Sequence, residues 1–205
     1  MNRVILFLYR KTLFTFFRFF KKRSYRNKNK EKNITIISSN CIGGCIYNDL
    51  GLKFNSPTIN LFFEANNYIK FCKNLKYYLN VELIESKNTK TTYPIGILDD
   101  IEIHFLHYSN FFEAKKKWDS RKKRVNYEKL FFIMTDRDKC NNTHVTQFLN
   151  LPYKNKIFFS SKNININDNS FIYCYKEKGE YISQNFPTFR KYEKYINIID
   201  WINKQ

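Results

Sequence analysis

The sequence predicts an α/β layered fold, in which helices flank a mostly parallel or mixed sheet and an amphipathic helix stands at the N-terminus. Short runs of β-branched and aromatic residues alternate with longer segments whose apolar residues recur at helical spacing. Glycine and proline are scarce, with 5 and 4 residues, and aromatic residues reach 19% of the 205 residues. This composition excludes collagen-like and intrinsically disordered chains.

Residues 1–22 predict a helix with its basic side chains on one arc of about 120°. These are Arg3, Arg10, Lys11, Arg18, Lys21 and Lys22. Two of them lie near the middle, where insertion into a bilayer costs about 2.5–3.5 kcal/mol per residue. We therefore expect an anchor that lies flat on a membrane surface. The alternatives are a helix packed on the protein's own body and a start codon placed too far upstream.

The charge is concentrated at the N-terminus. The first 32 residues hold 11 Lys and Arg and one Glu, which gives a net charge of +10 out of a total of +18. We expect residues 23–32 to form a polar linker and residues 33–205 to form a single α/β domain. Because this domain is only mildly basic, nucleic-acid binding is not expected. It remains an alternative function because the segment 115–124 is basic.

The body alternates predicted strands with predicted helices. Strands are expected at 33–38, 57–63, 81–84, 93–97, 101–108, 130–134, 156–160 and 171–175. Helices are expected after Cys41 and at 66–79, 111–124, 143–149 and 189–203. Sites in such sheets form at the carboxyl ends of strands. We therefore expect functional residues in the segments that follow the strands at 33–38 and 130–134.

The turn Ser39-Asn40-Cys41-Ile42-Gly43-Gly44 follows the first of these strands. A helix N-terminus lowers the pKa of a thiol, so Cys41 is a candidate nucleophile. Backbone N–H groups at Gly43 and Gly44 and the Asn40 side chain could hold an anion or oxyanion, with Ser39 beside them. The alternatives are a phosphate- or carboxylate-binding turn with an inert buried cysteine, and a plain structural turn.

Asp136, Arg137 and Asp138 follow the second strand. The two carboxylates could bind a divalent metal that bridges a nucleotide sugar, or a substrate hydroxyl. The alternative is an acidic residue that caps the next helix.

Two histidines are candidate general bases for Cys41 or for a substrate hydroxyl. His104 and His107 are three residues apart on a predicted strand and would point to opposite faces, with His107 on the more apolar one. Satisfied structural histidines are the alternative. The chain has 5 cysteines and no Cys-x-x-Cys spacing, which argues against zinc and favours reduced thiols in the cytosol.

Several separated motifs resemble, in order, a bacterial family of unassigned biochemistry, domain-of-unknown-function family 1919. They are IISSNCIGGCIYNDLGLKFNSPTINLFF, YPIGILDDIEIHFLHY, WDSRKKRVN, LFFIMTDRDKC and LPYKNKIFF. The resemblance covers residues 33–160, extends loosely to the C-terminus and leaves the N-terminal helix outside. The turn around Cys41 also resembles, over a few residues, the glycine-asparagine-cysteine turn of capsule acyltransferases that bind coenzyme A.

Members of this family are commonly labelled exopolysaccharide or capsule biosynthesis proteins. The resemblance implies an α/β fold and a role in surface-polysaccharide synthesis. We therefore expect a glycosyl- or acyltransferase on the inner face of the cell membrane that acts on a sugar or lipid-linked saccharide. Its donor would be a nucleotide sugar with a divalent metal, or an acyl donor. The alternative is a non-catalytic assembly module that binds a sugar nucleotide or a polysaccharide.

Overall fold

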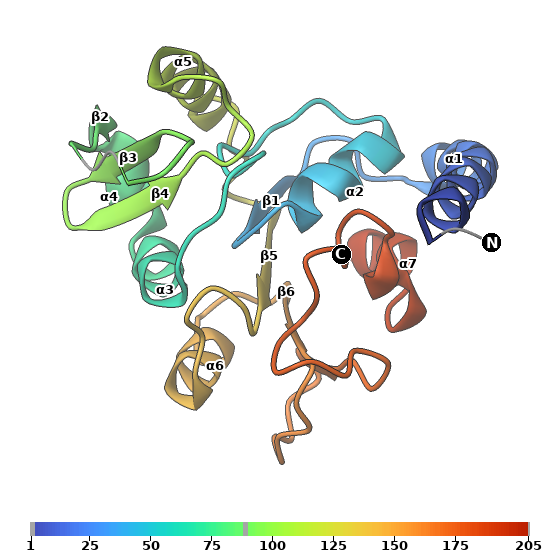
Figure 1. Cartoon of the computed structure of the whole chain (residues 1–205). Coiled ribbons are helices and arrows are strands. Elements are labelled where there is room, and N and C mark those ends of the chain that lie inside the picture. The colour runs from blue at the N-terminus through green and yellow to red at the C-terminus, as the bar shows by residue number, and fades with distance from the viewer. Residues whose placement is uncertain (1–2, 88–89, 205) are drawn as a thin grey trace.

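Four parallel strands form the central sheet in the order β1-β5-β6-β7 (Figure 1). The computed structural model describes residues 3–87 and 90–204, and side chains in the first helix from Thr12 onward. The strands are β1 (Thr35–Ser38), β5 (Leu130–Thr135), β6 (Lys156–Ser160) and β7 (Phe171–Tyr173). The predicted α/β class is confirmed, and all four strands begin within two residues of their expected positions.

Helices cover both faces of this sheet. They are α1 (Arg3–Lys28), α2 (Ile42–Leu50), α3 (Ala65–Lys73), α4 (Leu75–Asn80), α5 (Phe111–Lys122), α6 (Asn142–Leu149) and α7 (Ile198–Asn203), with a 3-10 turn η1 (Lys191–Lys194) before α7. The helix predicted over 66–79 divides into α3 and α4 because Asn74 leaves helical geometry, with φ −123° and ψ 43°. The helix predicted over 189–203 is limited to η1 and α7.

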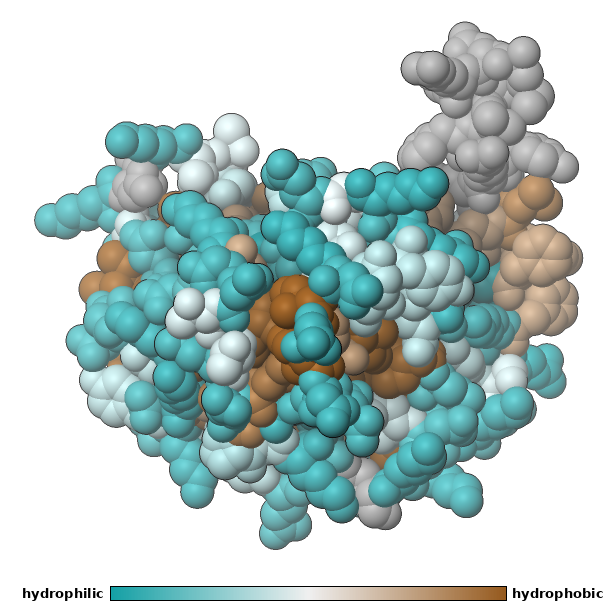
Figure 2. Space-filling model, turned by 90° about the horizontal axis from the view of Figure 1, so that it is seen from below, coloured by the Kyte–Doolittle hydropathy of each residue, from teal (hydrophilic) through white to brown (hydrophobic). Residues whose placement is uncertain are grey.

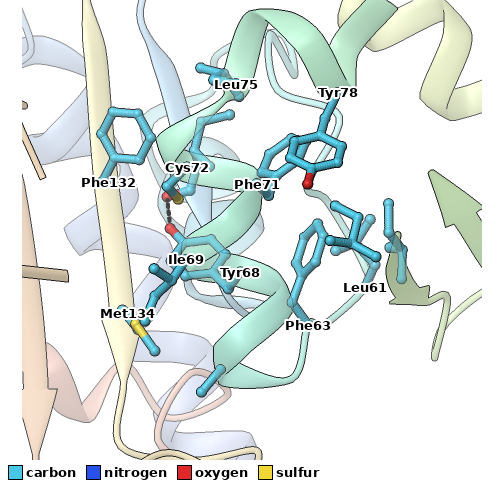
Figure 3. Packing of buried hydrophobic residues seen from close by; sticks show 14 of the residues in the cluster. Leu61, Phe63, Tyr68, Ile69, Phe71, Cys72, Leu75, Tyr78, Phe132 and Met134 are labelled. Atoms are coloured by element: carbon cyan, nitrogen blue, oxygen red, sulfur yellow. Dashed lines mark hydrogen bonds between the residues drawn. The ribbon is translucent and has the colours of Figure 1, made fainter. Parts of the chain in front are cut away.

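Successive residues of each central strand enter different cores, as the pleat of a strand requires. Ile37 and Phe132 belong to a core with α3 to α6, whereas Ile36 and Ile133 belong to a core with α2 and α7. On the first side, the Tyr68 hydroxyl donates to the Ile37 carbonyl at 2.9 Å, which fastens α3 to the sheet (Figure 3). Both faces of the strands are therefore buried, which explains their continuous apolar runs.

A second, antiparallel sheet contains β2 (Ile84–Glu85), β3 (Ile95–Leu98) and β4 (Ile101–His104). The hairpin of β3 and β4 matches the expected pair of strands, but β4 ends at His104 rather than at Tyr108. The segment expected as a strand at 57–63 bends instead, with Asn60 at φ 64°, and makes a single bridge, from Phe62 to His104. The next N–H, of Phe63, donates to the Ser39 carbonyl at 3.0 Å, so this segment joins the two sheets.

Helix α1 continues six residues beyond its expected end, so residues 23–28 are helical and not linker. Contacts with the body extend it, because the Tyr25 ring packs against the α2 and α7 core. The Arg18 guanidinium is buried and pairs with Asp49 and with Glu193, at 2.7 Å from the latter. The described half of α1 therefore packs on the protein's own body. Arg3, Arg10 and Lys11 carry side chains outside the described part.

Candidate functional site

The carboxyl ends of β1 and β5 open into a cleft of about 960 Å³. One wall is the first turn of α2, with Asn40, Cys41 and Gly44. A second wall is the β5–α6 loop with Arg137 and Asp138, and a third consists of segments around Asn60 and His107. The loop 184–190 closes the remaining side. The cleft therefore brings together the turn after β1, the loop after β5 and one of the two histidines.

Cys41 lies at the N-cap of α2 and lines the cleft. Burial raises the pKa of its thiol to about 11, and the nearby Cys45 adds to the rise. The expected lowering by the helix N-terminus is therefore not found, because desolvation of the thiolate outweighs it. At neutral pH roughly one molecule in ten thousand would carry the thiolate.

The Asn40 side chain makes two hydrogen bonds within the protein. Its Nδ2 donates to Thr135 Oγ1 at 3.0 Å, and its Oδ1 accepts from the Ile42 N–H at 3.2 Å. Asn40 thus joins the ends of β1 and β5 and caps α2. Ser39 is buried and bonded through its backbone to Ile133 and Phe63, and it does not line the cleft.

The two glycines differ in their surroundings. A Cβ on Gly43 would lie 3.0 Å from the Ser38 Cβ, so this glycine allows α2 to approach β1 closely. Gly44 faces the cleft, and a Cβ there would come no nearer than 3.4 Å, to Ile59. Gly43 does not line the cleft, and its lack of a side chain serves the packing of α2 on β1.

The two aspartates of the β5–α6 loop also have different surroundings. Asp136 accepts hydrogen bonds from Ser160 and Ser161, and from the N–H of Ile182 at 2.7 Å. Asp136 thus fixes the ends of β5 and β6 to the C-terminal region and does not line the cleft. Because the two carboxylates do not converge, the pair does not fit a divalent-metal site, and no cluster of three metal-ligating side chains occurs among residues 3–87 and 90–204.

Asp138 faces the cleft beside Arg137, with 3.8 Å between its Oδ1 and the Arg137 guanidinium. Burial raises the pKa of Asp138 above its ordinary value. Its backbone is left-handed, with φ 57°, and Lys139 follows with φ 64°. A carboxyl group with a raised pKa on a strained loop beside a cleft is typical of functional sites.

The histidines also occupy different environments. His107 follows the end of β4, is exposed and lines the cleft. His104 is 8% exposed and its ring stacks on Phe62, with centroids 4.4 Å apart; among the described residues neither ring nitrogen has a hydrogen-bond partner. Burial lowers the pKa of His104, so it is a neutral packing residue. The predicted placement of His107 on the apolar face is wrong because the strand stops three residues earlier.

The loop 184–190, which was not expected at the site, contributes Gln184, Asn185, Thr188 and Arg190 to the cleft. Arg190 has a left-handed backbone, with φ 51°, and its Nε lies 2.7 Å from Asp49 Oδ2. No motif marks this loop, since its place beside the cleft depends on the packing of η1 and α7. Amide side chains and the rings of Phe54 and Phe62 give the cleft groups suited to sugar hydroxyls and faces, and Arg137 suits an anion, whereas Arg190 is paired with Asp49.

Comparison with known proteins assigns the chain to a family. The family model described as "Domain of unknown function (DUF1919)" matches residues 13–203, so the chain belongs to this family. The match begins within α1, which corrects the expectation that this helix lies outside it. An "Uncharacterized protein" of Haemophilus influenzae is 34% identical over 190 residues, which cover 91% of this chain and 92% of that protein.

Proposed function

We propose that this protein is a transferase of bacterial exopolysaccharide or capsule synthesis that acts on a sugar or lipid-linked saccharide at the inner face of the cell membrane. The observation that carries the proposal is the convergence of Arg137, Asp138 and His107 on one cleft at the carboxyl ends of parallel strands. The role in polysaccharide synthesis is supported by the family resemblance of the sequence alone.

The site favours direct transfer to a hydroxyl group. The acceptor hydroxyl loses its proton to His107 or to ionised Asp138, and its oxygen forms a bond to the glycosyl or acyl carbon of the donor. The leaving group departs with the electron pair of the broken bond, and Arg137 stabilises its negative charge. Glycosyl transfer agrees best with the cleft, because a Cys41 thiol with a pKa of about 11 is a poor covalent nucleophile.

A cellular assay tests this proposal. Cells that lack the gene for this protein are complemented with the wild type, Asp138→Asn or His107→Ala. The amount of polysaccharide on their surface is then measured. Asp99→Asn is the matched control, because Asp99 also has a left-handed backbone, with φ 53°, and is exposed away from the cleft. We expect Asp138→Asn or His107→Ala to reduce the polymer and the control to retain it. Normal polymer with both cleft variants would refute the proposal.

A non-catalytic binding module is the second candidate. The observation in its favour is the burial of Cys41, which raises the pKa of its thiol and disfavours the nucleophilic thiolate. Such a module would bind a sugar nucleotide or polysaccharide without turnover. Donor consumption by purified protein in the presence of an acceptor saccharide separates the two candidates.

A further inference from the structure

The outward face of α1 carries large apolar side chains that nothing in the described structure covers. Phe16 and Phe20 are 60% and 56% exposed, and Phe17 and Phe19 are each 66% exposed. Neighbouring rings contact one another edge to face, with Phe16 and Phe20 centroids 5.3 Å apart. We call these four phenylalanines the aromatic ridge. Figure 2 shows the apolar surface at the edge of the molecule occupied by α1.

On its opposite face, α1 is held against the body by ion pairs and a hydrogen bond. Besides the buried Arg18, Lys21 Nζ lies 2.7 Å from Glu193, and Lys22 Nζ donates to Asn48 Oδ1 at 2.6 Å. Asp49 is 1% exposed and forms ion pairs with both Arg18 of α1 and Arg190 of the cleft rim. It therefore joins α1 to this rim. The body therefore neutralises part of the basic arc and fixes α1 with the aromatic ridge outward. Arg18, Lys21 and Lys22 therefore contact the body, which agrees with the alternative expectation of a helix packed on the protein itself.

The chemistry of this face indicates its occupant. α1 lies at the periphery of the molecule (Figure 1), and none of the described pockets is lined by the ridge, which therefore offers an open surface rather than a groove. The first acidic residue in the sequence is Glu31, and the first 32 residues carry a net charge of +10. Asp49 and Glu193 pair with Arg18, Lys21 and Lys22, but the charge that remains on this segment would repel that of a second copy of the chain, whereas an anionic lipid surface would attract it.

We propose that the aromatic ridge binds an anionic lipid bilayer, with α1 in the plane of the interface. The rings enter the headgroup boundary, and the exposed Arg23, which continues the same face, meets lipid phosphate. No helix in the described part of the chain is long and apolar enough to span a membrane, which agrees with binding at the surface. The inference rests on the proposed function, for which it names the contact surface.

The face of α1 opposite the ridge contacts the rim of the cleft. Phe14 of α1 packs edge to face on Phe189, with ring centroids 5.5 Å apart, and Asn48 and Arg190 line the cleft while contacting α1 or its partner Asp49. With the ridge on the bilayer, α1 lies between the lipid surface and this rim, and a saccharide carried on a membrane lipid would reach the cleft past α1.

The test is sedimentation of the full chain with vesicles of phosphatidylglycerol and phosphatidylcholine, compared with phosphatidylcholine alone. The triple variant Phe16→Gln/Phe17→Gln/Phe20→Gln removes most of the ridge, and we expect its partition onto the anionic vesicles to fall on the order of a hundredfold. Phe112→Gln is the matched control, because Phe112 is the most exposed large apolar residue outside α1, at 77%. Its partition should equal that of the wild type.

Three results would overturn the inference: no sedimentation of the wild type with anionic vesicles, equal loss in Phe112→Gln, or wild-type partition of the triple variant. A wild-type dimer that the triple variant converts to a monomer, with vesicle binding unchanged, would assign the ridge to a second copy instead. Asp138→Asn separates this inference from the proposed function, because it should reduce the polymer but leave vesicle binding intact.

Discussion

The two aspartates of the β5–α6 loop should respond oppositely to the same substitution. In Asp136→Asn the remaining oxygen can still accept from Ser160 and Ser161, but an amide N–H then faces the Ile182 N–H that now donates at 2.7 Å. Loss of a charge-assisted hydrogen bond and an unsatisfied donor together cost about 2–3 kcal/mol. For a chain of this size the melting temperature should fall by about 5–10 °C.

Asp138→Asn should leave stability unchanged or raise it. Burial raises the pKa of Asp138 in the folded state, so its charged form is disfavoured there, and this cost is present above the pKa of the unfolded chain. An amide removes the cost at neutral pH and suits the left-handed backbone at φ 57°. Thermal unfolding followed by circular dichroism measures both variants. A larger loss of stability in Asp138→Asn than in Asp136→Asn would refute this division of roles.

Other predictions concern the turn after β1 and the charged cluster at α1. Gly43→Ala should destabilise the fold by about 1–3 kcal/mol, because its Cβ would lie 3.0 Å from Ser38, whereas Gly44→Ala should be tolerated; equal melting temperatures would contradict this. Alkylation of Cys41, followed by mass spectrometry, should accelerate about tenfold per pH unit up to pH 10, since its pKa is about 11; a plateau near pH 8 would contradict this. Asp49→Ala should cost about 1–3 kcal/mol, because it removes one of the two carboxylates that pair with the buried Arg18 and the carboxylate that pairs with Arg190; unchanged urea unfolding would exclude the proposed anchoring of α1.

Much of the fold could be predicted from the sequence. The buried strands at 35–38 and 130–135 have continuous apolar runs, because both faces are covered, and the turns that follow them reach the carboxyl edge of the sheet as expected. The end of β4 could not be predicted, because Phe105 continues the apolar pattern after pairing has stopped. His104 and His107 were therefore given the wrong environments.

The candidate site was predicted in part for a similar physical reason. Cys41 and Asp138 follow strands, so local sequence sets their position, whereas Arg190 reaches the cleft through contacts with Asp49, 141 residues away in the sequence. The contrast between Asp136 and Asp138 depends on donors from Ser161 and Ile182, which only the folded chain brings together. The outward aromatic ridge likewise depends on Asp49 and Glu193, which no N-terminal pattern reveals.

Ligand binding in the cleft can be tested by amide NMR of the full chain titrated with uridine diphosphate as an anionic probe. We predict saturable shifts at residues 41–44 and 137–138, and their weakening in Arg137→Gln. Absence of saturable shifts, or shifts confined to surfaces outside the cleft, would contradict the assignment of this cleft as the ligand site.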